Sequence, residues 1–336
     1  MKRKATSLYG YSPTLEPFVG KTPTEAVDTL QRWGITVVFG GYQDPRFVEA
    51  VHQAGLKICA EFGCFVGREW WDRVPSSRPV TDAGAPLAEE GTYCGVNPST
   101  PEVREAQWAA LERLLLDHDI DGVWLDYIRW PCHWEVHNPL LHHTSFDPDT
   151  LFRFSRDLGL DLPVASAQAA HIVLDQYPAE WTAWRCQQVT SWVAEAREIL
   201  QCTRPEATMG LFGVPWRLAD HDGAILRIVG QDYRALGQYV DVLSPMVYHR
   251  MCGQDPSWIG QVVAEIRALS AHPVWPIIQS VDMPAVLSAP EYDRALEIAL
   301  CNPASDGVLV FTMEGAMDPD KLARTVARFT AADPSC

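Results

Sequence analysis

The chain has 336 residues, of which 47% are apolar and 21% are charged, a composition that excludes a largely disordered or fibrous protein. This length suits one large α/β barrel or two average domains. The 43 acidic and 27 basic residues give a formal net charge of −16, which repels phosphate backbones and anionic lipid, so we expect neither nucleic acid nor a membrane as a partner.

The sequence shows no targeting or membrane-spanning signal. No apolar run approaches the roughly 18 residues that a bilayer span needs, and the basic start of the chain precedes no apolar stretch of the secretory type. We therefore expect a cytoplasmic protein. The nine cysteines include no Cys-x-x-Cys pair, which predicts that most are reduced and buried.

Short β-rich runs alternate with helical patterns along the whole chain, and this alternation predicts parallel strands joined by crossover helices. The expected strands are residues 6–9, 36–40, 57–62, 122–127, 208–214, 240–248, 274–280 and 307–312. The expected helices are residues 24–33, 46–54, 102–117, 180–201, 232–238, 258–269, 291–300 and 319–329. Eight strands, each followed by a helix, predict a single catalytic (β/α)₈ TIM barrel over residues 1–336.

A barrel of this type usually takes roughly 250 residues, so the remaining residues are expected in long loops. We place them in two insertions, residues 63–98 after the third strand and residues 128–178 after the fourth, with a short helix at 149–158. A doubly wound open sheet is the competing architecture. The sequence has neither the G-x-G-x-x-G nor the Walker-type loop that would indicate it.

The active site of a TIM barrel lies at the carboxyl ends of its strands. Asp126 ends the apolar fourth strand in the segment GVWLDYIRWP, and Glu61 ends the third strand. Both are therefore candidate catalytic carboxylates. The alternatives are that Asp126 pairs with Arg129 or caps a turn, and that Glu61 forms a buried salt bridge.

Three further carboxylates follow barrel strands. Asp282 and Glu314 lie two residues beyond their strands, and Glu135 lies nine residues after Asp126. Each is a catalytic candidate, and the alternative is an ordinary solvated loop or rim residue.

Two carboxyl groups around an aromatic cleft are what cleavage of a glycosidic bond requires, one protonated and one ionised. Arg129 is expected to lower the pKa of Asp126, which suits a nucleophile or base, so that Glu61, Glu135 or Asp282 would be the acid. Aromatic, basic and histidine side chains near the strand ends are the substrate-binding candidates, with packing of the long loops as the alternative for the tryptophans. They are Trp70, Trp71, Arg129, Trp130, Trp216, Tyr248 and His249, and Trp134 is a further stacking candidate.

Four histidines fall within eleven residues and raise the alternative of a metal-dependent hydrolase using the His133 loop. They are His133, His137, His142 and His143. The prolines at 131 and 139 indicate a loop rather than a helix there, and no H-E-x-x-H motif is present, so we expect no metal and no cofactor.

The segments NPSTPEVREA and DIDGVWLDYIRWP, between residues 97 and 131, resemble the glycosyl hydrolase-like family 10 barrels and their amylase-like relatives. The later runs WRCQQVTSWV, MGLFGV and VDVLSPMVY are similar in order to strands five and six of that group, so the resemblance covers roughly residues 30–315. It implies that Asp126 is the nucleophile at the end of strand four. The fifth strand lacks the carboxylate that amylases use there as acid, so the resemblance does not assign the proton donor.

The sequence as a whole predicts a glycoside hydrolase that acts on an oligosaccharide or a glycoside, with Asp126 as nucleophile or base and Glu61 as the favoured acid. Two alternatives stay open: the metal-dependent hydrolase, and a carbohydrate-binding barrel without catalytic activity. Retention or inversion, the sugar, the linkage and the oligomeric state are left open by the sequence.

Overall fold

The computed structural model describes residues 4–89 and 93–331, and its centre is one sheet of eight parallel strands. The strands follow the order β1-β8-β7-β6-β5-β4-β3-β2. They are β1 (Ala5–Leu8), β2 (Val37–Phe39), β3 (Lys57–Gly63), β4 (Gly122–Asp126), β5 (Thr208–Gly213), β6 (Val242–Val247), β7 (Ile277–Gln279) and β8 (Gly307–Phe311). This arrangement confirms the predicted (β/α)₈ barrel.

The barrel closes between its first two strands. Tyr9, just beyond β1, forms a parallel bridge with Phe39 of β2. The backbone N–H groups of Gly10 and Tyr11 donate to the carbonyl oxygen of Phe39 at 3.2 and 2.8 Å, and the N–H of Thr36 donates to the carbonyl of Thr6 at 3.0 Å. These bonds leave neither β1 nor β2 as a free sheet edge.

The interior of the barrel is filled by a tryptophan that one glycine accommodates. Trp124 of β4 is fully buried, and its indole Nε1–H donates to the hydroxyl of Ser244 at 3.0 Å. A Cβ atom at Gly210 of β5 would lie only 2.0 Å from the Trp124 ring. The barrel is therefore a packed core below its mouth, not a pore.

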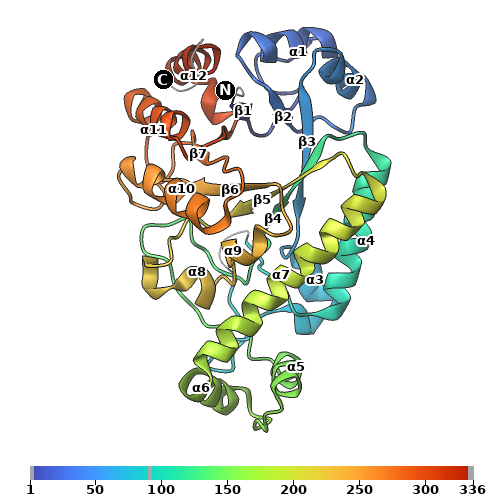
Figure 1. Ribbon diagram of the computed structural model, residues 1–336, viewed down its shortest axis with the longest axis vertical. Coiled ribbons are helices and arrows are strands. Elements are labelled where there is room, and N and C mark those ends of the chain that lie inside the picture. The colour runs from blue at the N-terminus through green and yellow to red at the C-terminus, as the bar shows by residue number, and fades with distance from the viewer. Residues whose placement is uncertain (1–3, 90–92, 332–336) are drawn as a thin grey trace.

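Helices surround the barrel, and Figure 1 shows α1 and α2 on one side and α10, α11 and α12 on the other. The crossover helices are α1 (Pro23–Arg32), α2 (Pro45–Gln53), α4 (Pro101–Asp117), α7 (Pro178–Thr203), α9 (Tyr233–Leu236), α10 (Ser257–Ser270), α11 (Ala289–Cys301) and α12 (Pro319–Thr330). All eight helices lie where the sequence predicts them. Local signals fix several starts; at α1, for example, Thr22 and Glu25 form a reciprocal capping box ahead of Pro23.

The two expected insertions contain more helix than the sequence indicates. The first holds α3 (Arg68–Arg73) and the 3₁₀ helix η1 (Pro75–Ser77), and its residues 90–92 lie outside the described residues. The second holds the predicted short helix as α5 (Pro148–Leu158) and also α6 (Ser166–Gln176). In Figure 1, α5 and α6 lie at the lower end of the molecule, away from α11 and α12.

Other short elements differ from expectation. The fifth strand leads into η2 (Asp220–Asp222) and α8 (Ala224–Arg227), and β8 leads into η3 (Gly315–Met317). The seventh strand is shorter than expected, because Pro276 has no N–H to donate and Val274 forms only an isolated bridge to Leu243. Within the described ranges, no helix is both long and apolar enough to cross a bilayer.

Candidate active site

The carboxyl ends of β3 and β4 bring Glu61 and Asp126 together. The two strands pair in parallel with Glu61 opposite Trp124 and Gly63 opposite Asp126. Side chains of a strand alternate between its two faces, so Asp126 lies on the same interior face as Trp124. Glu61, which is opposite Trp124 in the register, lies on that face as well. The side chains of Glu61 and Asp126 are hydrogen-bonded to each other at the mouth of the barrel.

The pKa values of the two carboxyl groups are separated by their surroundings. Burial, the negative charge of Asp126 and the hydrogen bond with Asp126 together raise the pKa of Glu61 to about 8, with burial as the largest cause. Burial also raises the pKa of Asp126 to about 6, against the opposing effects of the Tyr127 N–H and the Arg129 charge. Near pH 7 the pair therefore holds one proton, on Glu61.

Arg129 acts on Asp126 in the expected direction but does not decide the outcome. We expected its charge to bring the pKa of Asp126 below the ordinary value. Its charge does lower that pKa, but burial of the carboxyl group raises it more. The carboxylate is ionised at neutral pH because the proton resides on Glu61.

The backbone after Asp126 is turned sharply. Tyr127 has a φ of +50°, in the left-handed region that a tyrosine rarely adopts. In this conformation its N–H donates to Oδ1 of Asp126 at 2.6 Å. This bond fixes the carboxylate and stabilises its ionised form.

The ends of β3 and β4 are also locked to each other and to α4. The N–H of Cys64 donates to the carbonyl oxygen of Asp126 at 2.8 Å. The buried Gln107 of α4 donates its side-chain N–H groups to the carbonyls of Gly63, at 3.0 Å, and of Cys64. The backbone that carries the carboxyl pair is thereby held from two sides.

Arg129 is buried against two stacked tyrosines next to the pair. The rings of Tyr93 and Tyr127 stack with centroids 5.9 Å apart, and Cζ of Arg129 lies 5.1 and 5.3 Å from them. Its Nη1 donates to the hydroxyl of Tyr93 at 2.5 Å. The charge of the half-buried Glu135 acts on both Arg129 and Asp126, which makes Glu135 a third carboxyl group of this site.

Aromatic side chains form the wall around the carboxyl groups. Tyr248 is buried, with its ring 5.6 Å from Trp134 and 5.0 Å from Phe311. Burial and then the charges of Glu135, Asp126 and Glu61 raise the pKa of Tyr248, so its hydroxyl keeps its proton. Tyr9 continues the wall toward Phe311, at 5.7 Å between ring centroids.

Two of the five candidate carboxylates lie outside this group. Asp282 accepts from Nζ of Lys321 and from the N–H of Leu287, at 2.8 and 2.9 Å, and this ion pair and loop contact account for it. Glu314 is exposed in the turn that leads into η3.

Most of the remaining substrate-binding candidates are buried in the packing of the loops. Trp130 is fully buried and its Nε1–H donates to the carbonyl of Arg185 at 3.0 Å, so it presents no face to a sugar. Trp70 and Trp71 are buried under Arg73 and Arg78, and Trp216 is buried beside His221. His249 is fully buried, with Nε2 3.1 Å from Oε1 of Glu291. Nothing in these contacts supports the expected stacking platforms.

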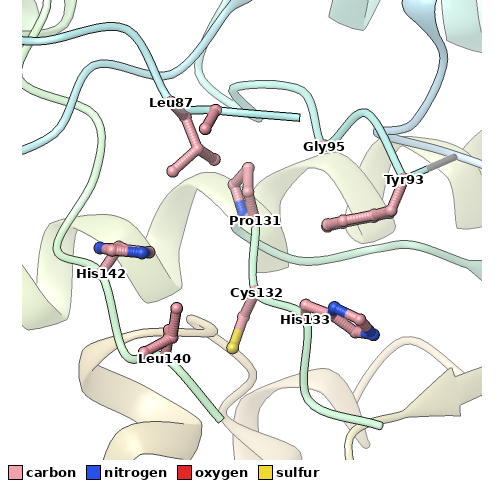
Figure 2. A pocket seen from close by; sticks show the side chains of 9 residues that line it. Leu87, Tyr93, Gly95, Pro131, Cys132, His133, Leu140 and His142 are labelled. Carbon is pink, nitrogen blue, oxygen red and sulfur yellow. The ribbon is translucent and has the colours of Figure 1, made fainter. Parts of the chain in front are cut away.

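The histidines of the second insertion are dispersed. Figure 2 shows His133 and His142 on different sides of the Pro131–Cys132 segment, lining a small pocket with Tyr93 and Leu140. His143 contacts Arg227 instead. In the part of the chain that the structure describes, no three His, Cys, Asp or Glu side chains are grouped as they would be to hold a metal ion.

Three residues of the site escape prediction from the sequence. Tyr127 could have been found, because it directly follows Asp126 at a strand end. Tyr93 lies in the first insertion and Gln107 in the middle of a helix, where no local pattern separates them from ordinary loop and helix residues.

A family model described as "Putative glycosyl hydrolase domain" matches residues 27–281, which include Glu61, Asp126 and Glu135. No curated protein matches the sequence significantly.

Several solved structures share the fold. The glycoside hydrolase domain of PgaB (BpsB) from Bordetella bronchiseptica has a TM-score of 0.69 and 13% identity, with 99% of this chain and 100% of that chain covered. The β-galactosidase from the psychrophilic Marinomonas ef1 has a TM-score of 0.69 and 12% identity, covering 97% of this chain and 59% of that one. The β-galactosidase of the haloarchaeon Halorubrum lacusprofundi gives 0.65 and 13%, with 98% and 58% covered. The chain thus spans about three-fifths of these β-galactosidases, and at such identities the likeness shows the fold alone.

Proposed function

Because the chain belongs to the DUF4015 family, described as "Putative glycosyl hydrolase domain", and is thereby a glycoside hydrolase, we propose that Asp126 is its nucleophile and Glu61 its acid. The observation that supports this most strongly is the hydrogen-bonded pair at the mouth of the barrel, with one carboxyl group protonated and the other ionised at neutral pH.

In the proposed reaction, the glycosidic oxygen of the substrate replaces Asp126 as the acceptor of the Glu61 proton. Glu61 protonates this oxygen while the bond to the anomeric carbon breaks, and the carboxylate of Asp126 attacks that carbon to form a glycosyl ester. Glu61, now ionised, takes a proton from water, and the resulting hydroxide displaces Asp126. Tyr127 and Arg129 stabilise the Asp126 carboxylate before attack and when it leaves.

The two pKa values predict a bell-shaped pH dependence of kcat/KM. Activity requires Asp126 ionised and Glu61 protonated, so it should rise as the pH passes about 6 and fall as the pH passes about 8. Initial rates on an aryl glycoside from pH 4.5 to 9.5 measure both limbs. A profile that keeps rising above pH 8.5 would show that Glu61 is not the acid.

The closeness of the pair predicts the stereochemistry. An inverting enzyme separates its carboxyl groups by roughly 6.5–9.5 Å to admit a water, whereas a retaining enzyme holds them about 5–5.5 Å apart. Carboxyl groups that hydrogen-bond to each other are nearer the second arrangement, so we expect retention of the anomeric configuration. Proton NMR of the first-formed product reads the anomer directly, and a product of opposite configuration would instead assign the second carboxyl role to the more distant Glu135.

We propose a carbohydrate substrate for this site. The substrate would be an oligosaccharide or a glycoside that binds at the mouth of the barrel, beside the aromatic side chains of Tyr9, Tyr248 and Phe311. We also propose that residues 1–336 form a single catalytic barrel related to the glycosyl hydrolase-like family 10 barrels and that the protein is cytoplasmic. Turnover that depends on Asp126 is the direct test, and it separates an enzyme from a barrel that only binds carbohydrate.

A further inference from the structure

Arg185 of α7 is a buried cation that the catalytic proposal does not use. The residue has no exposed surface, and Cζ of its guanidinium lies 4.4 Å from the ring of Trp130 and 5.7 Å from that of Trp181. Its Nη2 donates to the carbonyl oxygen of Ile228 at 2.6 Å. The two indole rings stabilise the cation in part, but they accept no hydrogen bond from the edge of the guanidinium.

Donors in this region remain without acceptors. Nε and Nη1 of Arg185 are buried and have no hydrogen-bond partner, and neither has Nδ1 of His143. Nε2 of His143 lies 3.0 Å from Nη1 of Arg227, which can only donate. The imidazole must therefore accept at Nε2 and carry its proton at Nδ1, so the unpartnered Nδ1 is a donor as well.

The charges of the cluster, defined as Arg185, Arg227 and His143, are of one sign. Burial and then the charges of Arg185 and Arg227 lower the pKa of His143 to about 4, and burial lowers the pKa of Arg185 to about 9. The facing carboxylates are peripheral: Asp222 is 99% exposed and 3.9 Å from Arg227, and Asp82, which acts on His143, is also exposed. A buried guanidinium with free donors and no buried carboxylate is costly unless an anion accompanies it.

We propose that Arg185, His143 and Arg227 form a binding site for a small monovalent anion, chloride under ordinary conditions. The N–H groups of Arg185 and His143 would donate to the anion, and Arg227 would orient the imidazole and add its charge. Nε2 of His143 already accepts from Arg227, and every other polar side-chain atom of the cluster is a donor, which suits an anion and excludes a metal cation as the occupant.

The anion would join three parts of the fold. Arg185 lies on α7, Arg227 ends α8, which packs against α7, and His143 belongs to the loop between β4 and α5. Figure 1 shows α8 and α7 on the side of the molecule from which the α5 and α6 insertion extends. Trp130, whose ring Arg185 covers, directly follows Arg129 of the carboxyl site, so the anion would stabilise the start of this insertion.

Thermal unfolding in matched salts tests the site without using activity. We expect the Tm of the full chain to rise saturably, by roughly 2–4 °C, when sodium chloride replaces sodium gluconate at constant ionic strength. Arg185→Lys keeps the charge but loses the forked donors, and it should lose at least half of this rise. Arg113→Lys, at an exposed arginine of α4, is the matched control and should keep it.

A second measurement needs no variant. Crystals of the wild-type protein grown with sodium bromide should show an anomalous peak between Arg185 and His143. If Arg185→Lys does not fold, Arg227→Gln replaces it, since this side chain is partly exposed, and should likewise reduce the chloride effect. Equal Tm values in chloride and gluconate, or a bromide map without that peak, would overturn the proposal and leave Arg185 as a cation stabilised by its two tryptophans and the Ile228 carbonyl.

Discussion

Asp126→Asn is expected to lower kcat/KM by at least about 10³-fold on any glycoside that the enzyme hydrolyses, which corresponds to about 4 kcal/mol of lost transition-state stabilisation. The amide has the shape of the carboxylate and can still accept the Tyr127 N–H, but it can neither attack the anomeric carbon nor hold a negative charge opposite it. Steady-state rates on a panel of aryl glycosides and oligosaccharides measure the loss.

The interpretation depends on the fold and on binding being preserved. Circular dichroism and Tm should match those of the wild type, and calorimetry should still detect oligosaccharide binding to Asp126→Asn. Asp117→Asn, at the exposed end of α4, is the control and should keep full activity. Turnover that survives in Asp126→Asn would remove the proposed nucleophile and favour a barrel that works through other groups.

Glu61→Gln is expected to lower kcat/KM by about 10²–10⁴-fold on substrates whose leaving group needs a proton. The loss should shrink to less than about tenfold on dinitrophenyl glycosides, because this leaving group departs as an anion without protonation. The same variant should lose the fall in activity near pH 8, since Glu61 is the group that titrates there. Comparison of alkyl and dinitrophenyl glycosides gives the first result, and the pH profile gives the second.

Stability provides an independent control for Glu61→Gln. The pKa of Glu61 is raised on folding, so between the ordinary glutamate pKa and about 8 the folded chain keeps a proton that the unfolded chain releases. The contribution of Glu61 to the free energy of unfolding is therefore largest at low pH and declines as the pH rises toward 8. The glutamine cannot ionise, so the Tm of the variant relative to the wild type should increase from pH 6 to pH 9. Glu314→Gln, at an exposed carboxylate, should show no such trend. If Glu135→Gln, and not Glu61→Gln, removes activity only on poor leaving groups, Glu135 is the acid.

The order of the elements and the position of the carboxyl pair could be predicted because both depend on local patterns. Apolar runs that end on Glu61 and Asp126 mark the carboxyl ends of two neighbouring strands, and in a parallel barrel such ends meet at one mouth. The sequence does not reveal the direct hydrogen bond between them, which depends on the register of β3 against β4. Nor does it reveal that burial would outweigh Arg129 in setting the pKa of Asp126.

The tryptophans show why the rest of the site could not be predicted. Their positions in long loops suggest open stacking faces, but Trp130 and Trp71 are covered by arginines and hydrogen-bonded through their indole nitrogens to backbone carbonyls. Whether an aromatic ring in a loop faces solvent or the interior is determined by segments far away in the chain, such as α7 for Trp130.

The glycine at position 210 has a consequence for how this enzyme can diverge or be redesigned. Since the indole of residue 124 occupies the space where any larger neighbour on β5 would lie, the two positions can change only in concert. Glu61 is opposite Trp124 in the register of β3 and β4, so a substitution at position 124 or 210 would shift the packing beneath Glu61 and Asp126. New specificities should therefore arise by changes in the two long insertions, while Trp124 and Gly210 are retained together.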